Sequence, residues 1–530
     1  MWQQNSMPIG NSLGVSALVA AAPIFVMLFL LLVERKPTWM AALSALLAAA
    51  IVARFAYAMP VATMLAAMSY GAAFGLFPIA WIVLWAIVLY RLTVETGRFE
   101  ILQDSIGGLT RDRRLQALLI AFAFGAFLEG AAGFGAPVAV AAAMLTGLGF
   151  SRFNAAGICL LANTAPVAFG SIGIPIITLA GVTGLPVNDL SKEIGRICAP
   201  VSVIIPAYLI FVTEGAPALK GVLPAALLCG IAYGGVQFLV SNFLGPQLTA
   251  ILASLAAMGS LIILIKVWKP KDNFRAAAAE DFLEPVRHGA RKIFMAWLPY
   301  LLLVLLVLLW GLDMVKKPLD ALTVSVPWPG LHNSGPGPRP STPVSYKLNF
   351  ITASGTACMF AVLLASLFLR VTRKQFGKIM SVSIRQLALP VLTIVSVLSF
   401  AFLMNFSGTT ATLGLAFAST GRAFPFFSAW LGWLGVFLTG SDTSSNALFG
   451  NLQAVTAGRL GLDPVLMAAA NSSGGVMGKM ISLSSIAVAA AATGLPRSDE
   501  AKLFRFTLKH SLILATAIGL IVALYASQSM

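Results

Sequence analysis

Three ionisable side chains, Glu129, Asp442 and Lys479, lie within long apolar stretches of this 530-residue sequence. A charge in the middle of a bilayer costs at least about 2.5–3.5 kcal/mol on insertion scales, so such residues are functional candidates by default. A buried carboxyl group can carry a proton, and we predict this role for Glu129 and Asp442. We predict that the amine of Lys479 attracts the anionic group of a substrate.

Each of these residues also has a purely structural interpretation. Glu129 and Lys479 could form an ion pair with each other, and Asp442 could only cap the start of a helix. Lys479 could extend its amine toward the membrane surface. The sequence leaves these alternatives open.

The stretch "GSDTSSNALFGN" at 440–451 surrounds Asp442 with hydroxyl and amide side chains, between two apolar segments. Such groups can hydrogen-bond a carboxylate and a hydroxyl group. A single serine would be explained by helix–helix contact, but an unbroken polar run at 441–446 predicts a binding site. We expect the substrate to contact these residues of the stretch: Ser441, Thr443, Ser444, Ser445 and Asn446.

Three further stretches interrupt apolar sequence: "EGAAGFGAP" at 129–137, "ANTAP" at 162–166 and "ANSSGG" at 470–475. Irregular backbone at membrane depth is tolerated only where it is buried in protein or lines a wet cavity. The stretches 129–137 and 440–451 are therefore predicted to be the tips of two re-entrant helical hairpins. The stretches 162–166 and 470–475 are predicted to be breaks in helices. Exposed N–H groups at such breaks suit an anion. These stretches complete the predicted substrate site with Gly130, Gly133, Gly135, Asn163, Thr164, Asn471, Ser472 and Ser473.

The elements that position these residues are membrane spans. The chain is 58% hydrophobic and 10% charged, whereas a soluble domain has about 25% charged residues. Apolar runs near the length of a bilayer core recur, which predicts an all-α polytopic membrane protein of roughly 12 to 14 segments. The formal charge of +16 is explained by basic cytoplasmic loops rather than by a nucleic-acid partner. The four cysteines lack metal-ligand spacing and are expected to be buried.

Loop composition predicts the topology. The basic loop 266–292 is placed in the cytoplasm, and the Pro/Gly-rich loop 315–347 is expected to be a flexible exterior loop. The basic loop at 34–36 then places the N-terminus outside. The stretch 59–90 is ambiguous, because it could form two spans or one span with a shallow segment. The first apolar run lacks a basic region before it and is predicted to be a retained span.

An internal repeat is predicted, because 124–140 resembles 434–450 and "TGLP" occurs at 183–186 and again at 493–496. The linker 91–114 is basic, whereas its counterpart contains one basic residue. The two halves are therefore expected to have opposite orientations, as in many secondary transporters. We treat 1–530 as one membrane domain with three parts: a first inverted repeat (78–215), connecting spans (216–389) and a second inverted repeat (390–530).

An enzyme is not indicated. The three histidines are isolated in the sequence, and it contains no zinc-protease or serine-hydrolase motif. An ATP-driven pump would need a phosphate-binding loop, and "GVMGKM" at 475–480 lacks the earlier glycine, the strand and the soluble domain of such a loop. A channel stays open as an alternative, because only flux kinetics separate saturable accumulation from passive conduction.

The interrupted stretches resemble the bacterial L-lactate permease family, which includes glycolate permeases. The matching sequences are "GAAGFGAPVAV" at 130–140, "NTAPVAFGSIG" at 163–173 and "GSDTSSNALFGNLQ" at 440–453. The resemblance implies a symporter of the bacterial inner membrane that takes up small 2-hydroxymonocarboxylates (L-lactate, D-lactate, glycolate) together with a proton. It implies no cofactor, and it leaves a homo-oligomer open.

The sequence is also similar to a broader ion-transporter superfamily, in which Ser-Asn-Thr-like motifs at hairpin tips and broken helices bind a carboxylate and a coupling cation. The matching positions are Ser444, Ser445 and Asn446, Asn163 with Thr164, and Asn471 with Ser472. The first tip has no hydroxyl group, which favours a proton over sodium. The resemblance also implies an elevator-like displacement of the hairpins and broken helices. Sodium-coupled transport of an organic anion and a passive anion channel are the alternatives.

Overall fold

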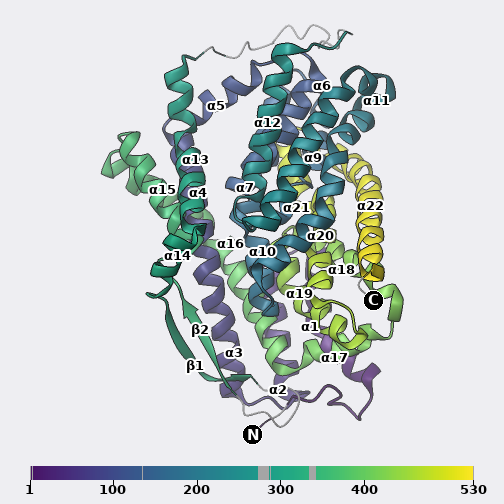
Figure 1. Cartoon of the computed structure of the whole chain (residues 1–530). Coiled ribbons are helices and arrows are strands. Elements are labelled where there is room, and N and C mark those ends of the chain that lie inside the picture. Colours follow the sequence, from purple (N-terminus) through teal and green to yellow (C-terminus); the bar gives the residue numbers. More distant parts are fainter. Residues whose placement is uncertain are drawn as a thin grey trace.

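The structure, a computed structural model, is a bundle of membrane-length helices with one small β-hairpin (Figure 1). It describes residues 2, 4–133, 135–271, 286, 288–333 and 342–528. Within these ranges nine helices are long and apolar enough to cross a membrane, or up to eleven if each of two bent helix pairs counts as one span. The prediction of an all-α polytopic membrane protein is confirmed.

Two packed helices and one long, interrupted helix open the chain. The elements are α1 (Leu13–Leu32), α2 (Thr38–Phe55), α3 (Val61–Phe74), η1 (Gly75–Ala80), α4 (Trp81–Glu95) and α5 (Arg98–Gly107). The elements α3, η1 and α4 form a single 35-residue span, Val61–Glu95. Neither alternative for 59–90 holds as stated, because the structure has one helical segment there, interrupted at Phe77 beside Pro78.

The glycine-rich stretch forms the turn of a helical hairpin, and a bent helix pair follows it. The elements are α6 (Arg113–Gln116), η2 (Ala117–Phe124), α7 (Gly125–Ala131), α8 (Ala136–Gly147), α9 (Arg152–Ala162), η3 (Val167–Phe169) and α10 (Gly170–Thr183). Gly135 precedes α8 in the left-handed conformation (φ 82°), which glycine adopts without strain. The bent pair turns by 64° at 163–166, where the sequence predicts a break.

The connecting part of the chain contains a long helical hairpin, α11, and the β-hairpin. Its elements are α11 (Val187–Phe243), α12 (Thr249–Val267), α13 (Ala290–Gly311), α14 (Asp313–Asp320), β1 (Val324–Asn333), β2 (Thr342–Leu348) and α15 (Ser354–Phe368). The segment α11 is interrupted at Gly215 (φ 84°) and again at Val222, and its two arms lie antiparallel. Ser191 in the first arm donates to the Ser241 oxygen in the second at 2.9 Å. Arg275 and Arg287, two basic residues of the predicted cytoplasmic loop 266–292, lie outside the described residues.

The expectation that 315–347 is a flexible loop is wrong for the residues that the structure describes, whereas its exterior location stays a prediction. The strands β1 and β2 pair in antiparallel fashion and lie along α3 (Figure 1). The indole N–H of Trp328 donates to the Ala66 oxygen at 3.0 Å, and the Tyr346 hydroxyl donates to the Phe77 oxygen at 2.5 Å. Aromatic side chains that the composition did not single out therefore hold this segment on α3 and η1. Its Pro-rich part, 334–341, lies outside the described residues.

The final third of the chain presents the same order of elements as the first part. Its elements are α16 (Arg373–Ser407), α17 (Thr409–Ala418), η4 (Gly421–Ala423), α18 (Phe424–Thr439), α19 (Asp442–Leu460), α20 (Pro464–Gly478), η5 (Lys479–Ile481), α21 (Leu483–Thr493) and α22 (Arg497–Gln528). A long helix containing a proline is followed by a short helix, a hairpin, a bent pair and another long helix. The predicted boundaries of the repeat stay a prediction.

The predicted position of the second helix break is wrong. The helix α20 continues through 470–475 without interruption, and the pair bends by 42° only at Ser482. The glycines of this stretch serve close packing instead: a Cβ atom on Gly474 would lie 2.0 Å from the Ala429 oxygen of α18. Small residues at helix interfaces let backbones approach closely in membranes. Glycine and serine in this stretch therefore indicate a helix–helix contact, not a break.

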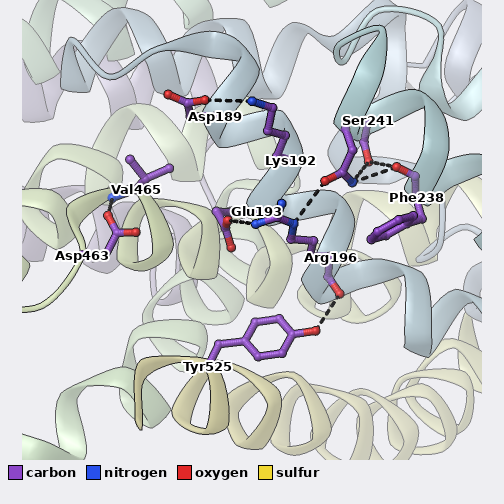
Figure 2. A network of polar contacts seen from close by, with 10 residues as sticks. Asp189, Lys192, Glu193, Arg196, Phe238, Ser241, Asp463, Val465 and Tyr525 are labelled. Atoms are coloured by element: carbon purple, nitrogen blue, oxygen red, sulfur yellow. Dashed lines mark hydrogen bonds and ion pairs between the residues drawn. The ribbon is translucent and has the colours of Figure 1, made fainter. Parts of the chain in front are cut away.

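The two halves meet along their bent pairs and terminal helices. Arg152 at the start of α9 donates to the Gly494 oxygen just beyond α21 at 2.9 Å, so the start of one bent pair lies at the end of the other. Figure 2 shows a second meeting point, where Tyr525 of α22 donates to the Arg196 oxygen of α11 at 3.4 Å. Arg196 also donates to Glu193 at 2.7 Å. This surface network joins α11 and α22.

Candidate functional site

The two hairpin turns and the two helix breaks surround one cavity of about 770 Å³. The middle of α16 and the loop between α1 and α2 complete its wall. All three ionisable residues that the sequence singles out lie on this wall: Glu129, Asp442 and Lys479. Segments that are more than 300 residues apart in the chain, such as Glu129 and Asp442, therefore share one site.

Asp442 lies at the second hairpin turn, in the first turn of α19. Ser441 caps this helix, since its hydroxyl oxygen accepts a backbone N–H of the first turn at 3.2 Å. Asp442 Oδ2 accepts from Ser472 Oγ at 2.6 Å and from Asn446 Nδ2 at 3.4 Å. Asp442 Oδ1 is buried, packs near Gly475 and has no hydrogen-bond partner among the described residues. Helix capping therefore does not account for Asp442.

A chain of buried amide groups supports Asp442 from behind the cavity wall. Asn446 Nδ2 donates to the Pro175 oxygen of α10 at 3.1 Å, which joins the two halves of the chain. Asn471 Nδ2 donates to Asn446 Oδ1 at 2.9 Å, and Gln453 Nε2 donates to Asn471 Oδ1 at 3.0 Å. Because these groups satisfy one another, they fix the positions of α10, α19 and α20.

Glu129 lies near the end of α7, beside the first helix break. Its Oε2 atom accepts from Asn163 Nδ2 at 3.3 Å. A Cβ atom on Gly170 would lie 2.8 Å from Glu129 Oε1, so glycine leaves room for the carboxyl group. Ser171 Oγ donates to the Ala132 oxygen at 3.2 Å, which ties the break to the first hairpin turn. The first turn and the first break thus form one unit around Glu129.

The first break contains an unusual backbone conformation. Ser171, Ile172 and Gly173 have φ values of 46°, 60° and 76°, so three consecutive residues are left-handed. The left-handed conformation is higher in free energy for residues that have a Cβ atom. Backbone strain of this kind clusters at functional sites. The turn places Ser171 on the cavity wall while the Ile172 side chain is fully buried.

Lys479 connects the second hairpin turn to the second break. Its amine donates to the Gly440 oxygen at 2.5 Å, where α18 ends. An ammonium group has three N–H donors, so this bond leaves donors for an anion. Among the described residues Lys479 forms no ion pair with Glu129, whose hydrogen bond comes from Asn163 instead. The two side chains therefore form no direct ion pair, although their opposite charges still interact across the site.

The residues predicted to form the site fall into two groups. Those on the cavity wall are Glu129, Gly135, Ser441, Asp442, Thr443, Ser444 and Lys479. Those that do not line the cavity are Gly130, Gly133, Asn163, Thr164, Ser445, Asn446, Asn471, Ser472 and Ser473. Gly130 packs on α12, because a Cβ atom there would lie 2.9 Å from Ile251. The second group holds the wall in place rather than forming it.

Several residues on the wall were not anticipated. Ser484 and Ser485 lie at the start of α21, where Ser482 caps the helix. The serines at 482, 484 and 485, shortly after Lys479, are a signal that could have indicated them. Arg35 and Lys36, in the loop between α1 and α2, also line the cavity. No local signal marks these two, because only tertiary contacts bring their loop to the site.

Metal chemistry has no candidate site in the part of the chain that the structure describes. No group of three or more His, Cys, Asp or Glu side chains there could hold a metal ion. The four cysteines are buried and do not form disulfides. The chemistry available in the cavity is therefore that of carboxyl, amine, guanidinium and hydroxyl groups.

A multi-pass helix bundle whose hairpin turns and broken helices surround a polar cavity defines a membrane transporter and not an enzyme. The chain belongs to the L-lactate permease family, whose sequence model matches residues 16–528. It is similar to the "L-lactate permease" of Bacillus subtilis strain 168, with 46% identity over 99% of this chain and 98% of the relative. It is also similar to the "Glycolate permease GlcA" and the "L-lactate permease" of Escherichia coli K12, each at 43% identity over the same shares. The protein is thus a multi-pass protein of the bacterial inner membrane.

Proposed function

We propose that this protein transports lactate and glycolate and that it does so as a proton-coupled symporter of small 2-hydroxymonocarboxylates, including D-lactate. The relatives named as L-lactate and glycolate permeases support the substrate class. One observation carries the mechanism: a single cavity brings together one amine, Lys479, and two carboxyl groups, Glu129 and Asp442. An amine suits the anion, and a carboxyl group can bind and release the coupled proton.

The substrate carboxylate is assigned to Lys479 and the hydroxyl groups near it. The starts of α19 and α21 both line the cavity beside this amine. Backbone N–H groups at helix starts carry a partial positive charge that favours an anion. Ser441, Thr443 and Ser484 add hydroxyl groups that can hydrogen-bond both the carboxylate and the 2-hydroxyl group. The substrate therefore binds at the second hairpin turn.

The proton is assigned to the two carboxyl groups. Asp442 has one oxygen without a partner among the described residues, and Glu129 receives one hydrogen bond, from Asn163. Either group can therefore take up a proton without breaking an ion pair. Lys479 is the only basic side chain at the buried end of the cavity among the described residues, and one amine suits a single carboxylate. This arrangement supports a monocarboxylate as the substrate.

Movement of the site is assigned to the hairpins and bent pairs. The bent pairs lie head to tail, with Arg152 of the first at Gly494 beyond the second. This arrangement supports the proposed inverted repeats at 78–215 and 390–530, which would let the site face each side of the membrane in turn. The elevator-like displacement of these elements is part of the proposal.

The coupling is tested by uptake of labelled L-lactate into proteoliposomes with an imposed pH gradient. A one-to-one symporter should accumulate L-lactate by about tenfold per pH unit, because one pH unit corresponds to about 1.4 kcal/mol. The gradient should be acid outside, and the flux should saturate with substrate concentration.

Controls separate this mechanism from the alternatives. Protein-free liposomes report diffusion of undissociated lactic acid, and a sodium gradient at equal pH reports sodium coupling. Accumulation driven by sodium and insensitive to pH would contradict proton coupling. Flux that does not saturate and never exceeds equilibrium would indicate a passive anion channel.

A further inference from the structure

The mouth of the cavity carries positive charge that the proposed mechanism does not use. Arg35 and Lys36 line the same cavity as Lys479, but they are exposed, whereas Glu129 and Asp442 are only 6% and 3% exposed. The exposed end of the cavity is therefore basic, and its acidic groups lie at the buried end.

The charge of this loop is largely uncompensated. Arg35 forms no hydrogen bond or ion pair with the residues that the structure describes, and Lys36 has only a 4.0 Å contact with the exposed Glu34. The helix α2, which begins at Thr38, has no acidic residue in its first turn. A basic loop with this exposure is explained by topology alone in most membrane proteins. A purely topological role, however, would not require the loop to lie on the wall of the cavity.

We infer that Arg35 and Lys36 capture the substrate anion at the mouth of the cavity and exchange it with Lys479. This inference rests on the proposed function and adds positioning residues to it. Mouths lined by one sign of charge raise the local concentration of an oppositely charged substrate and its rate of association. The capture is one-sided, because these residues belong to the loop that the positive-inside rule places in the cytoplasm.

The test measures L-lactate exchange in oriented vesicles, with the half-saturation concentration determined separately on each face. The double variant R35Q/K36Q should raise the half-saturation concentration on the face carrying the α1–α2 loop by roughly three- to tenfold at low ionic strength. The effect should shrink with added salt, because the screening length falls from about 30 Å at 0.01 M to about 10 Å at 0.1 M. The half-saturation concentration on the opposite face should stay unchanged.

Arg370→Gln is the matched control. Arg370 is also an exposed arginine with left-handed backbone, with φ 54° against 50° for Arg35, but it does not line the cavity. This variant should leave both half-saturation concentrations unchanged. The single variant Arg35→Lys, which keeps the positive charge, should raise the half-saturation concentration less than the single variant Arg35→Gln does.

The outcomes separate the inference from the function on which it rests. If the wild-type protein exchanges L-lactate but R35Q/K36Q changes neither face, the inference is overturned and the proposed function stands. An equal change in the half-saturation concentration on both faces would also overturn the inference. So would a change that added salt does not reduce. Absence of L-lactate exchange in the wild-type protein would contradict the proposed function itself.

Discussion

At the scale of single residues, the main question is whether both carboxyl groups of the cavity are needed to carry the proton. Asp442 is held by hydrogen bonds from Ser472 and Asn446 on one oxygen, while its other oxygen is unpartnered among the described residues. Glu129 is held by Asn163 beside the first break. The two groups lie at opposite hairpin turns, and therefore their substitutions can be told apart.

We expect E129Q and D442N each to retain L-lactate exchange but to lose most of the gradient-driven accumulation, which is about tenfold per pH unit in a one-to-one symporter. The reason is that each amide keeps the shape of the side chain and an oxygen that accepts hydrogen bonds but cannot carry a proton. Paired measurements of exchange and net uptake check this. If a variant still accumulates L-lactate to the wild-type level, proton coupling survives the substitution. The substituted carboxyl group would then be excluded as the proton carrier.

At the scale of elements, glycines decide how closely the second hairpin packs on its broken helix. A Cβ atom on Gly474 of α20 would lie 2.0 Å from the Ala429 oxygen of α18, and one on Gly432 of α18 would lie 1.8 Å from the Asn471 oxygen. These contacts are to backbone atoms, which cannot rotate away. The spacing of α18 and α20 therefore requires glycine, and this spacing places Asn471 and Ser472 behind Asp442.

We expect Gly474→Ala to destabilise the protein by about 1–3 kcal/mol, as overpacking in a tight interface does. The thermal unfolding midpoint in detergent and the rate of L-lactate exchange should both fall. Gly458→Ala is the matched control, because Gly458 lies in α19 of the same hairpin and a Cβ atom there would meet nothing within 4 Å. Its stability should be equal to or up to about 1 kcal/mol above that of the wild type. Equal midpoints for both variants would contradict the packing argument.

At the scale of the whole molecule, the cavity faces the loop between α1 and α2. This loop, the middle of α16 and the starts of α19 and α21 all contribute to one wall. The protein is therefore open toward the face that carries Arg35.

The β-hairpin lies on α3, and Phe350, just beyond β2, stacks on Phe77 with ring centroids 6.0 Å apart.

We expect a cysteine at Ser484 to be labelled by a membrane-impermeant thiol reagent from the face that carries Arg35. Ser484 is exposed on the cavity wall, and the four native cysteines are buried, so the background should be low. L-lactate should slow the labelling because it occupies the same cavity. Labelling only from the opposite face would show that the cavity opens the other way. A cysteine at Gly458, outside the cavity, is the control for protection by substrate.

Much of the fold and part of the site could be predicted from the sequence, because the relevant signals are local. Long apolar runs indicate spans, and a polar or glycine-rich interruption such as 440–446 indicates a turn. The break at 470–475 was misplaced because glycine marks either a break or a close contact, and only the position of α18 decides between them. The strands at Val324–Asn333 and Thr342–Leu348 were missed because their aromatic contacts are with α3.

The sequence by itself determined the class of protein, the family and the three ionisable residues that need an explanation. Hydrophobicity and the cost of a buried charge are properties of short segments, and no tertiary contact is needed to recognise them. Only the tertiary structure decided that Glu129, Asp442 and Lys479 share one cavity, that Asn446 and Asn471 support its wall, and that Arg35 lies at its mouth. The physical reason is that these relations depend on packing between distant segments, which the order of residues in any one segment does not reveal.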